Sequence, residues 1–332
     1  MRATVLGGGS WGTALATQLA RIGHDTVMWD RNPARCDHIN THHTNPRYLK
    51  GEPLPESLAA SPDLQEAVAR AEILVPVVPS HALRSVLEQA APALGADTLV
   101  CCATKGIENE TLDTMFEVCV ETLGGPDRVS MLYGPSFALE VTRGMPTAVV
   151  VAGRDAGAHE AAEAFHGDMF RAYHTEDVVG VCIGGSLKNV MAIACGVSDG
   201  VGLGSNARAA LITRGLAEIT RVGVAMGANP LTMAGLAGMG DLVLTCTGNL
   251  SRNRRVGLAL GEGRTLAQIL EELGEVAEGV TTASSAHALS SKLGVEMPIT
   301  DQIYAMLYED KPVQQALMDL MGRDRRAERD QG

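Results

Sequence analysis

Aromatic residues are scarce in this chain of 332 residues, where phenylalanine, tryptophan and tyrosine together make up 3%. Hydrophobic residues still make up 45% and charged residues 20%, so we expect a sizeable core built mainly from aliphatic side chains and methionine. The length suggests two domains. Glycine is frequent, with 37 residues, but it follows no collagen-like period and forms no low-complexity segment.

Long hydrophobic runs are also missing. No uninterrupted apolar run reaches the roughly 20 residues of a membrane span. A strand is expected within two residues of Met1, with no signal-peptide pattern before it. The seven cysteines are odd in number and contain no C-x-x-C pair. We therefore expect reduced, buried thiols in a cytoplasmic protein without a membrane span.

Positive charge is in deficit. The 27 lysines and arginines stand against 39 acidic residues, giving a net charge of -12 and a pI of about 5.2. This balance argues against a general partner of nucleic acids or anionic membranes. It leaves room for a small anionic metabolite, because a few local cations suffice to hold one phosphate.

The first 30 residues form one recognisable unit. A short apolar run at residues 3–6 precedes Gly7-Gly8-Gly9-Ser10-Trp11-Gly12, a helical pattern follows at residues 13–22, and a second strand is expected at residues 26–29. A Gly-x-Gly-x-x-Gly motif between a strand and a helix is typical of dinucleotide binding, whereas the same motif without this context is an ordinary glycine-rich turn.

Each motif glycine has a distinct expected task. Gly7 permits the tight turn, Gly9 lets the backbone approach a pyrophosphate, and Gly12 allows the helix to pack on the strand. Asp30 stands where an acidic residue would hold the ribose hydroxyls of NAD. Arg31 follows it and could meet the 2′-phosphate of NADP, so both cofactors stay open.

Further apolar runs are expected to be parallel strands joined by helices, and Ser61 is expected to cap one of these helices. The runs lie at residues 73–78, 98–102, 129–133 and 147–151. Pro76 favours a strand end or a sheet edge. Ligands of such sheets bind outside the carboxyl ends of the strands, which makes Lys105 and Ser136 site candidates, although Lys105 alone could be a solvated loop lysine. We expect His81 at a helix start, near the cofactor and without a chemical role.

The second half reads as nearly all α-helical. Helices are expected at about residues 206–226, 265–273, 281–293, 300–308 and 312–321. Between the two halves, residues 187–197 contain only two polar side chains, Lys188 and Asn189. The pattern predicts a buried helix, in which Lys188 either extends its amine to water or supplies an amine to an internal site.

Two more segments of this half attract attention. Asp241 and Thr245 lie in a largely apolar, glycine-rich segment. Ser251 is expected to cap a helix whose first turn, residues 252–255, is strongly basic. Cations at a helix N-terminus oppose the helix dipole. This turn is therefore either solvated or the site of a phosphate that takes both the N–H groups and an arginine.

Together, these motifs closely resemble the bacterial NAD(P)-dependent glycerol-3-phosphate dehydrogenases, and the resemblance extends over almost the whole chain. The resembling segments are residues 7–14, 79–81, 103–107, 134–138, 187–194, 198–208, 240–247, 251–255 and 295–300. The resemblance implies a Rossmann domain at residues 1–180 and an all-α domain of the 6-phosphogluconate dehydrogenase type at residues 181–332. It implies interconversion of dihydroxyacetone phosphate and sn-glycerol 3-phosphate, for glycerophospholipid synthesis.

The resemblance also assigns residues. Lys188 matches the family's catalytic lysine. Substrate-site positions are matched by Lys105, Gly134, Ser136, Asn189, Asp241, Thr245, Ser251, Arg252 and Asn253. Cofactor-site positions are matched by Gly7, Gly9, Ser10, Trp11, Gly12, Arg31, Lys105, Ala138, Arg252, Val276 and Glu278. NAD or NADP is the implied cofactor, no metal ion is expected, and we expect a homodimer as the commonest assembly.

The implied chemistry requires a proton for the alkoxide formed at C2, and Lys188 would donate and accept it. Burial and Lys105 would lower the pKa of Lys188 from its usual value, whereas Asp241 would raise it. A β-hydroxyacid or 6-phosphogluconate dehydrogenase is the alternative enzyme, because it shares the architecture and the Lys-Asn pair. A redox-sensing dinucleotide-binding module is the non-enzyme alternative, but it would not require these charged residues and no DNA-binding segment is present.

Overall fold

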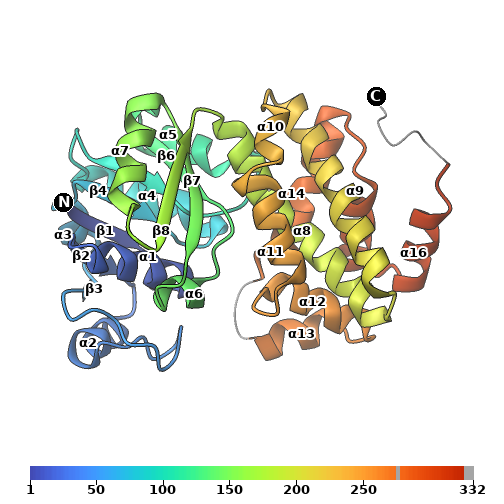
Figure 1. Ribbon diagram of the computed structural model, residues 1–332, viewed down its shortest axis with the longest axis horizontal. Coiled ribbons are helices and arrows are strands. Elements are labelled where there is room, and N and C mark those ends of the chain that lie inside the picture. Colours follow the sequence, from blue (N-terminus) through green and yellow to red (C-terminus); the bar gives the residue numbers. More distant parts are fainter. Residues whose placement is uncertain (274–276, 325–332) are drawn as a thin grey trace.

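The structure is a computed structural model that describes residues 1–273 and 277–324, apart from the side chain of Asp155. An α/β half, coloured blue to green in Figure 1, lies beside a helical half coloured yellow to red. This agrees with the predicted Rossmann and all-α parts. The predicted boundary between residues 180 and 181 falls within the first turn of helix α8 (Val178–Val201), and the division there stays a prediction.

The α/β half is built on one eight-stranded sheet of order β3-β2-β1-β4-β5-β6-β7-β8. Its strands are β1 (Arg2–Leu6), β2 (Asp25–Trp29), β3 (Ala59–Ser61), β4 (Ile73–Pro76), β5 (Leu99–Cys102), β6 (Val129–Tyr133), β7 (Thr147–Gly153) and β8 (Phe170–Thr175). Strands β1 to β6 are parallel. Their carboxyl ends therefore share one edge of the sheet, where ligands of such folds bind.

Helices connect these strands and cover the sheet (Figure 1). They are α1 (Ser10–Arg21), α2 (Pro33–His42), α3 (Leu64–Ala69), α4 (Ser80–Ala90), α5 (Met115–Leu123), α6 (Ala138–Thr142) and α7 (Asp155–Phe165). Pro76 is the last residue of β4, so the expectation of a strand end is confirmed. All seven cysteine side chains are buried.

Three expectations about the sheet were wrong or incomplete. Residues 147–151 were expected to form a parallel strand, but β7 is antiparallel to β6. The connection at residues 134–146 contains only the five-residue helix α6, whereas a parallel crossover usually carries a longer helix across the sheet. Strands β3 and β8 were not predicted, because β3 has three residues and β8 is a largely exposed edge strand.

The expected helix cap at Ser61 was also wrong. Ser61 ends β3, and Asp63 caps α3 instead, where its side chain accepts a hydrogen bond of 3.0 Å from the Glu66 amide. Proline is unsuitable in a central ladder but is tolerated at a strand end. Pro62 therefore separates the end of the strand from the cap, which moves the helix start by two residues.

The helical half surrounds α8, which runs through its centre (Figure 1). The other helices are α9 (Gly204–Ala225), α10 (Pro230–Met233), α11 (Asp241–Thr247), α12 (Arg252–Gly261), α13 (Leu266–Leu273), α14 (Glu278–Leu293), α15 (Pro298–Tyr308) and α16 (Val313–Met321). Every residue of α8 from Gly180 to Ser198 is buried. The long apolar pattern thus predicted correctly a buried core helix.

Glycines bring α8 and α12 into backbone contact. A Cβ atom on Gly196 would lie 2.1 Å from the carbonyl oxygen of Arg254, and one on Gly257 would lie 2.0 Å from that of Ile193. Since no side chain fits between the two backbones, this crossing fixes how α12 lies on α8. It places the start of α12 next to the lysine-bearing part of α8.

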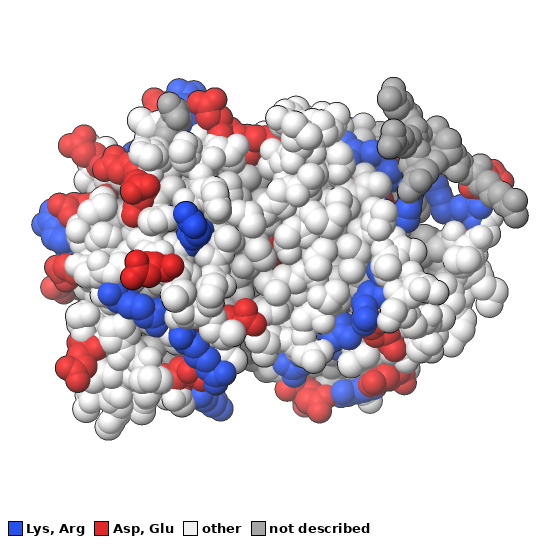
Figure 2. Space-filling model, in the orientation of Figure 1, with Lys and Arg blue, Asp and Glu red and all other residues white. Residues whose placement is uncertain are grey.

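By length and composition α8 could span a membrane, but 89% of its apolar window is buried inside the protein. Core helices of globular domains have the same composition. Figure 2 shows acidic and basic side chains interspersed over the α/β half and few charges over the middle of the face in view.

Candidate active site

The glycine motif lies between β1 and α1 and has the geometry expected from the sequence. Gly7 has a φ of +125°, which favours glycine. A Cβ atom on Gly12 would lie 1.9 Å from the carbonyl oxygen of Gly7, so the helix can approach the turn only without a side chain there. A Cβ atom on Gly9 would meet no protein atom within 4 Å. Space is thus left where a ligand could approach the backbone.

The residues around this turn fit a dinucleotide pyrophosphate. Gly9 is the N-cap of α1 and supplies no capping side chain, so the first-turn N–H groups, which begin with Ser10, lack intrahelical acceptors. The Nε1 atom of Trp11 is buried without a hydrogen-bond partner. Ala138 is the first residue of α6, which packs against α1. The structure therefore brings these predicted cofactor residues to one corner.

The end of β2 carries the two residues that left the cofactor preference open. Asp30 is 4% exposed and accepts hydrogen bonds from the Asn32 amide, at 2.9 Å, and from Arg35. Arg31 is exposed. His81 is the second residue of α4 and is exposed, as expected for a helix-start histidine.

Lys188 lies in the buried part of α8, and its side chain is 8% exposed. Its amine does not extend to water but forms an ion pair with one carboxylate oxygen of Asp241, which is 1% exposed. The other oxygen of Asp241 accepts a hydrogen bond of 2.7 Å from Lys105. A single buried carboxylate therefore holds both predicted lysines.

The segment before Asp241 positions this residue in the site. Residues Leu236–Gly240 form a π-helical turn that leads directly into α11, of which Asp241 is the first residue. A Cβ atom on Gly184 would lie 2.8 Å from the carbonyl oxygen of Ala237, so this turn packs directly on α8. The Thr245 hydroxyl donates to the carbonyl oxygen of Asp241 at 2.6 Å and lies 3.4 Å from its Oδ1 atom.

Lys105 comes from the other half of the molecule. It follows β5 at the shared carboxyl edge of the sheet. Its amine lies 3.4 Å from the carbonyl oxygen of Gly134, which also accepts a hydrogen bond of 3.0 Å from Ser136. The predicted residues after β5 and β6 therefore meet Asp241 and Lys188 where the sheet edge faces the helical half.

The start of α12 and the start of α14 complete this region. Ser251 caps α12, as predicted, by accepting a hydrogen bond from the Arg254 amide at 3.2 Å. The side-chain oxygen of Asn253 accepts from the Gly279 amide at 3.0 Å. A Cβ atom on Gly279 would lie 2.7 Å from the carbonyl oxygen of Asn189. Asn189 and Asn253 are therefore neighbours, although 64 positions separate them.

The basic first turn of α12 is partly neutralised within the chain. Arg254 donates to Asp199 from its Nε atom, at 3.0 Å, and from its Nη2 atom, at 2.5 Å. Arg254 is therefore an internal ion-pair partner. Arg255 is exposed, and Arg252 lies on the side of the turn near Glu278.

Burial dominates the electrostatics of the site. The pKa of Lys188 is lowered to about 8, because desolvation together with the nearby Lys105 cation lowers it by more than Asp241 raises it. Desolvation also raises the pKa of Glu278 to about 7, although Arg252, Lys105 and Lys188 all act to lower it. Displaced pKa values of this kind cluster at functional sites. Val276, the remaining predicted cofactor residue, lies outside the described residues.

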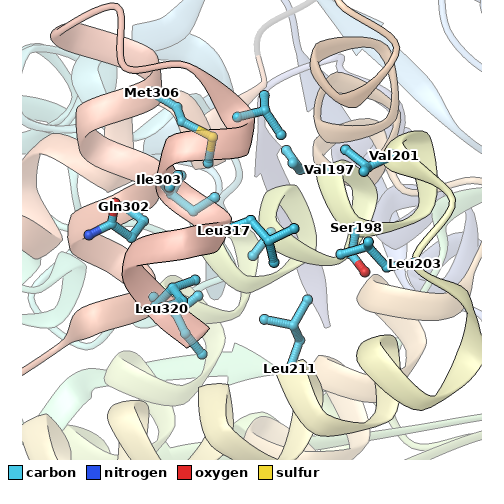
Figure 3. A pocket seen from close by; sticks show the side chains of 14 residues that line it. Val197, Ser198, Val201, Leu203, Leu211, Gln302, Ile303, Met306, Leu317 and Leu320 are labelled. Atoms are coloured by element: carbon cyan, nitrogen blue, oxygen red, sulfur yellow. The ribbon is translucent and has the colours of Figure 1, made fainter. Parts of the chain in front are cut away.

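An apolar cavity of about 60 Å³ lies elsewhere, between α8, α9, α15 and α16 (Figure 3). Of the α8 residues that line this cavity, Ala194 is the nearest in sequence to Lys188. At 1.5 Å per residue it lies about 9 Å from Lys188 along the helix axis. Leu317 and Leu320 of α16 face it, and no charged side chain lines it. It therefore lacks the groups that a phosphate or a dinucleotide requires. In the described part of the chain, no cluster of three histidine, cysteine or acidic side chains could hold a metal ion.

Sequence reasoning missed two residues that contact this site. Tyr133 was read only as the end of a strand, yet its ring lies 5.4 Å from the Lys105 amine. Ser186 hydrogen-bonds to both the amide and the carbonyl group of Gly106, at 3.1 and 3.0 Å, which joins α8 to the loop after β5. The position of Tyr133 directly before Gly134 was the available signal.

Comparisons with known proteins identify the family of this chain. The family models "NAD-dependent glycerol-3-phosphate dehydrogenase N-terminus" and "C-terminus" match residues 2–159 and 177–318. The glycerol-3-phosphate dehydrogenase [NAD(P)+] of Anaeromyxobacter dehalogenans is 54% identical over 331 residues, covering 99% of this chain and all of that protein. The one of Geobacter metallireducens is 54% identical over 328 residues, covering 98% of each.

A solved structure extends the likeness to three dimensions. The glycerol-3-phosphate dehydrogenase of Coxiella burnetii is 43% identical, with a TM-score of 0.92 over 97% of this chain and 99% of that one. Both halves of the chain are thus matched, in sequence and in fold. The chain belongs to the NAD-dependent glycerol-3-phosphate dehydrogenase family.

Proposed function

We propose that this enzyme catalyses reversible hydride transfer between NAD(P)H and dihydroxyacetone phosphate, giving sn-glycerol 3-phosphate. The observation that carries the proposal is the buried Asp241 carboxylate that holds Lys188 and Lys105 where the sheet edge meets the helical half. This arrangement places a titratable amine beside a second cation in a site shielded from water. A ketone that gains a hydride needs both charge stabilisation and a proton.

Lys188 is the proposed proton donor and acceptor. As an ammonium it polarises the ketone oxygen and gives a proton to the developing alkoxide. In the reverse direction the neutral amine takes the proton back. A pKa of about 8 makes both forms accessible near neutrality, and Asp241 orients the amine. The bound nicotinamide supplies or accepts the hydride.

The remaining predicted substrate residues position the ligand. Arg252 and the first-turn amides after Ser251 suit the substrate phosphate, because a helix N-terminus and a guanidinium both favour an anion. Asn189, Thr245 and Asn253 line the neighbouring region, where the Gly279 amide orients the side chain of Asn253 by a hydrogen bond of 3.0 Å. Anchoring the phosphate orients the carbonyl carbon, which lowers the entropic cost of reaching the reactive geometry.

The cofactor would occupy the corner at the glycine motif. Ser10, Trp11 and Gly12 in the first turn of α1 suit its pyrophosphate, and Arg31 suits its adenosine end. Glu278 and Ala138 would lie along its path to the nicotinamide, together with Lys105 and Arg252. Either NAD or NADP fits these residues.

We also propose a cellular role, a location and an assembly for this enzyme. The product supplies glycerophospholipid synthesis, and the enzyme acts in the cytoplasm as a homodimer. Cyclic homodimers are the commonest assemblies of soluble oligomeric proteins, which is the basis for the proposed dimer.

Oxidation of NADH and NADPH, followed by absorbance with dihydroxyacetone phosphate as the sole acceptor, tests the activity. We expect rapid oxidation of the cofactor with this acceptor and no oxidation with the keto precursors of 3-hydroxyacids. In the reverse direction, we expect no reduction of NAD or NADP by 6-phosphogluconate. Turnover with one of the latter compounds but not with dihydroxyacetone phosphate would assign the chain to another reaction.

A further inference from the structure

We propose that Tyr133 is a positioning residue for the reaction, acting through Lys105. It is the last residue of β6, and its side chain is fully buried, with an exposed fraction of 0%. Neither the sequence resemblance nor the comparisons give Tyr133 a role. The inference rests on the proposed function, because its effect is expected on turnover of dihydroxyacetone phosphate.

The first contact is made by the hydroxyl group. It donates a hydrogen bond of 2.7 Å to the carbonyl oxygen of Thr104, the residue directly before Lys105. Burial raises the pKa of Tyr133 well above its usual value, so the group stays protonated and keeps donating. Thr104 is held from its other side as well, since its own hydroxyl donates to the carbonyl oxygen of Val78 at 2.8 Å. The backbone at Lys105 is therefore fixed in position.

The second contact is made by the ring. The Lys105 amine lies 5.4 Å from the ring centroid, within the range of a favourable cation–π interaction, which is stronger where the pair is shielded from water. This interaction and the Asp241 carboxylate, at 2.7 Å, act on the same amine. Together they confine the flexible lysine side chain to the site.

The third contact joins the ring to the helix that carries Lys188. A Cβ atom on Gly185 would lie 2.3 Å from the Cδ2 atom of Tyr133, so α8 rests directly on the ring. Gly185 lies three residues before Lys188, which is nearly one helical turn. The backbone of α8 therefore holds the ring in place from the side of Lys188 and keeps it against the loop that bears Lys105.

This arrangement predicts that Tyr133 affects turnover only while Lys105 is present. A double-mutant cycle with Tyr133→Leu and Lys105→Met measures that dependence. We expect Tyr133→Leu to lower kcat/KM for dihydroxyacetone phosphate about 10- to 30-fold in the native background, in line with the loss of both contacts. In the Lys105→Met background it should have less than a two-fold effect. An equal loss in both backgrounds would overturn the inference.

Tyr133→Phe keeps the test decisive if Tyr133→Leu fails to fold, because it keeps the ring and removes only the hydroxyl. We expect a smaller loss of about three-fold, again absent in the Lys105→Met background. Tyr308→Phe is the matched control, since it removes a tyrosine hydroxyl that donates to a backbone carbonyl, that of Val280, at 2.8 Å. The kcat/KM of Tyr308→Phe should equal that of the native enzyme. An unchanged kcat/KM in Tyr133→Phe as well would show that the Tyr133 hydroxyl has no role and would contradict the proposal.

The pH profile gives a readout that a purely structural role would not move. The groups facing Lys188 are Asp241, Lys105, Glu278 and the Cys246 thiol. Displacing Lys105 in Tyr133→Leu removes a repelling cation, so the apparent pKa of the oxidation reaction should rise. If the native enzyme does not turn over dihydroxyacetone phosphate, the proposed function is refuted. If the native enzyme is active but the effects of the two substitutions are additive and the pH profile of Tyr133→Leu does not shift, only the role of Tyr133 is refuted.

Discussion

Lys188 and Asp241 form an ion pair inside the protein, where the carboxylate is 1% exposed and the lysine residue 6% exposed. The two residues are 53 positions apart and belong to different helices. A buried charge without a partner is costly, so each of the two depends on the other. Since Asp241 also holds Lys105, the pair determines both the protonation and the position of the amines in the site.

The pH dependence of the two directions should be opposite. Burial lowers the pKa of Lys188 to about 8, so the neutral amine required for oxidation accumulates as the pH rises through 8, and the ammonium required for reduction is lost. We expect kcat/KM for sn-glycerol 3-phosphate oxidation to increase about ten-fold per pH unit below this value and then to level off. Initial rates between pH 6 and 10 measure this, and parallel profiles in the two directions would contradict the role of Lys188.

Asp241→Asn should shift that profile. The Asp241 charge raises the pKa of Lys188, so its removal lets burial and Lys105 lower the value further. Reduction at neutral pH should slow by about 10- to 150-fold, the equivalent of the roughly 1.5–3 kcal/mol of a hydrogen bond to a charged group. The apparent pKa of oxidation should move below 8, and a rise instead would show that Asp241 does not control the lysine.

Arg252→Ala should mainly raise the KM for dihydroxyacetone phosphate. Losing one charged hydrogen bond to a phosphate corresponds to an increase of about 10- to 150-fold. Arg255→Ala is the matched control, because this exposed arginine lies in the same helical turn. Steady-state kinetics distinguish the two variants, and an unchanged KM in Arg252→Ala would remove this residue from the phosphate site.

Gly9→Ala should separate cofactor binding from folding. A Cβ atom there meets no protein atom within 4 Å, so the melting temperature should stay nearly unchanged. The methyl group would occupy the approach to the pyrophosphate, and we expect at least a roughly ten-fold weaker Kd for both NADH and NADPH, or about 1.4 kcal/mol. Gly12→Ala, in contrast, should lower the melting temperature, because its Cβ atom would overlap the Gly7 carbonyl oxygen. Calorimetric titration and thermal unfolding measure the two effects, and normal cofactor binding in Gly9→Ala would place the pyrophosphate elsewhere.

The elements that follow from side-chain patterning were predictable. The apolar run around Lys188 indicated a buried helix, Ser251 indicated a helix start, and the Gly7 turn indicated a dinucleotide corner, because each pattern is local. Strand direction is not a local property, and β7 was therefore assigned the wrong orientation. The polar edge strand β8 lacks an alternating apolar pattern and was missed for that reason.

In the candidate site, too, local patterns were predictable from the sequence and contacts between distant residues were not. Lys188, Lys105 and Asp241 could be named from the sequence, but their meeting at one carboxylate depends on tertiary packing. Tyr133 was missed, because a tyrosine at the end of a buried strand looks like an ordinary core residue and only its place directly before Gly134 pointed to the site. Its contact with Lys105 depends on how β5 and β6 lie side by side, and its contact with α8 depends on the missing side chain of Gly185.

The central claim is that Lys188 transfers the proton. The most direct measurement is single-turnover reduction of dihydroxyacetone phosphate by Lys188→Ala, alongside calorimetric titration of the same variant with cofactor. We predict turnover reduced roughly 100- to 10,000-fold, as for loss of a general acid, with cofactor affinity retained. A near-normal single-turnover rate constant in this variant would contradict the account.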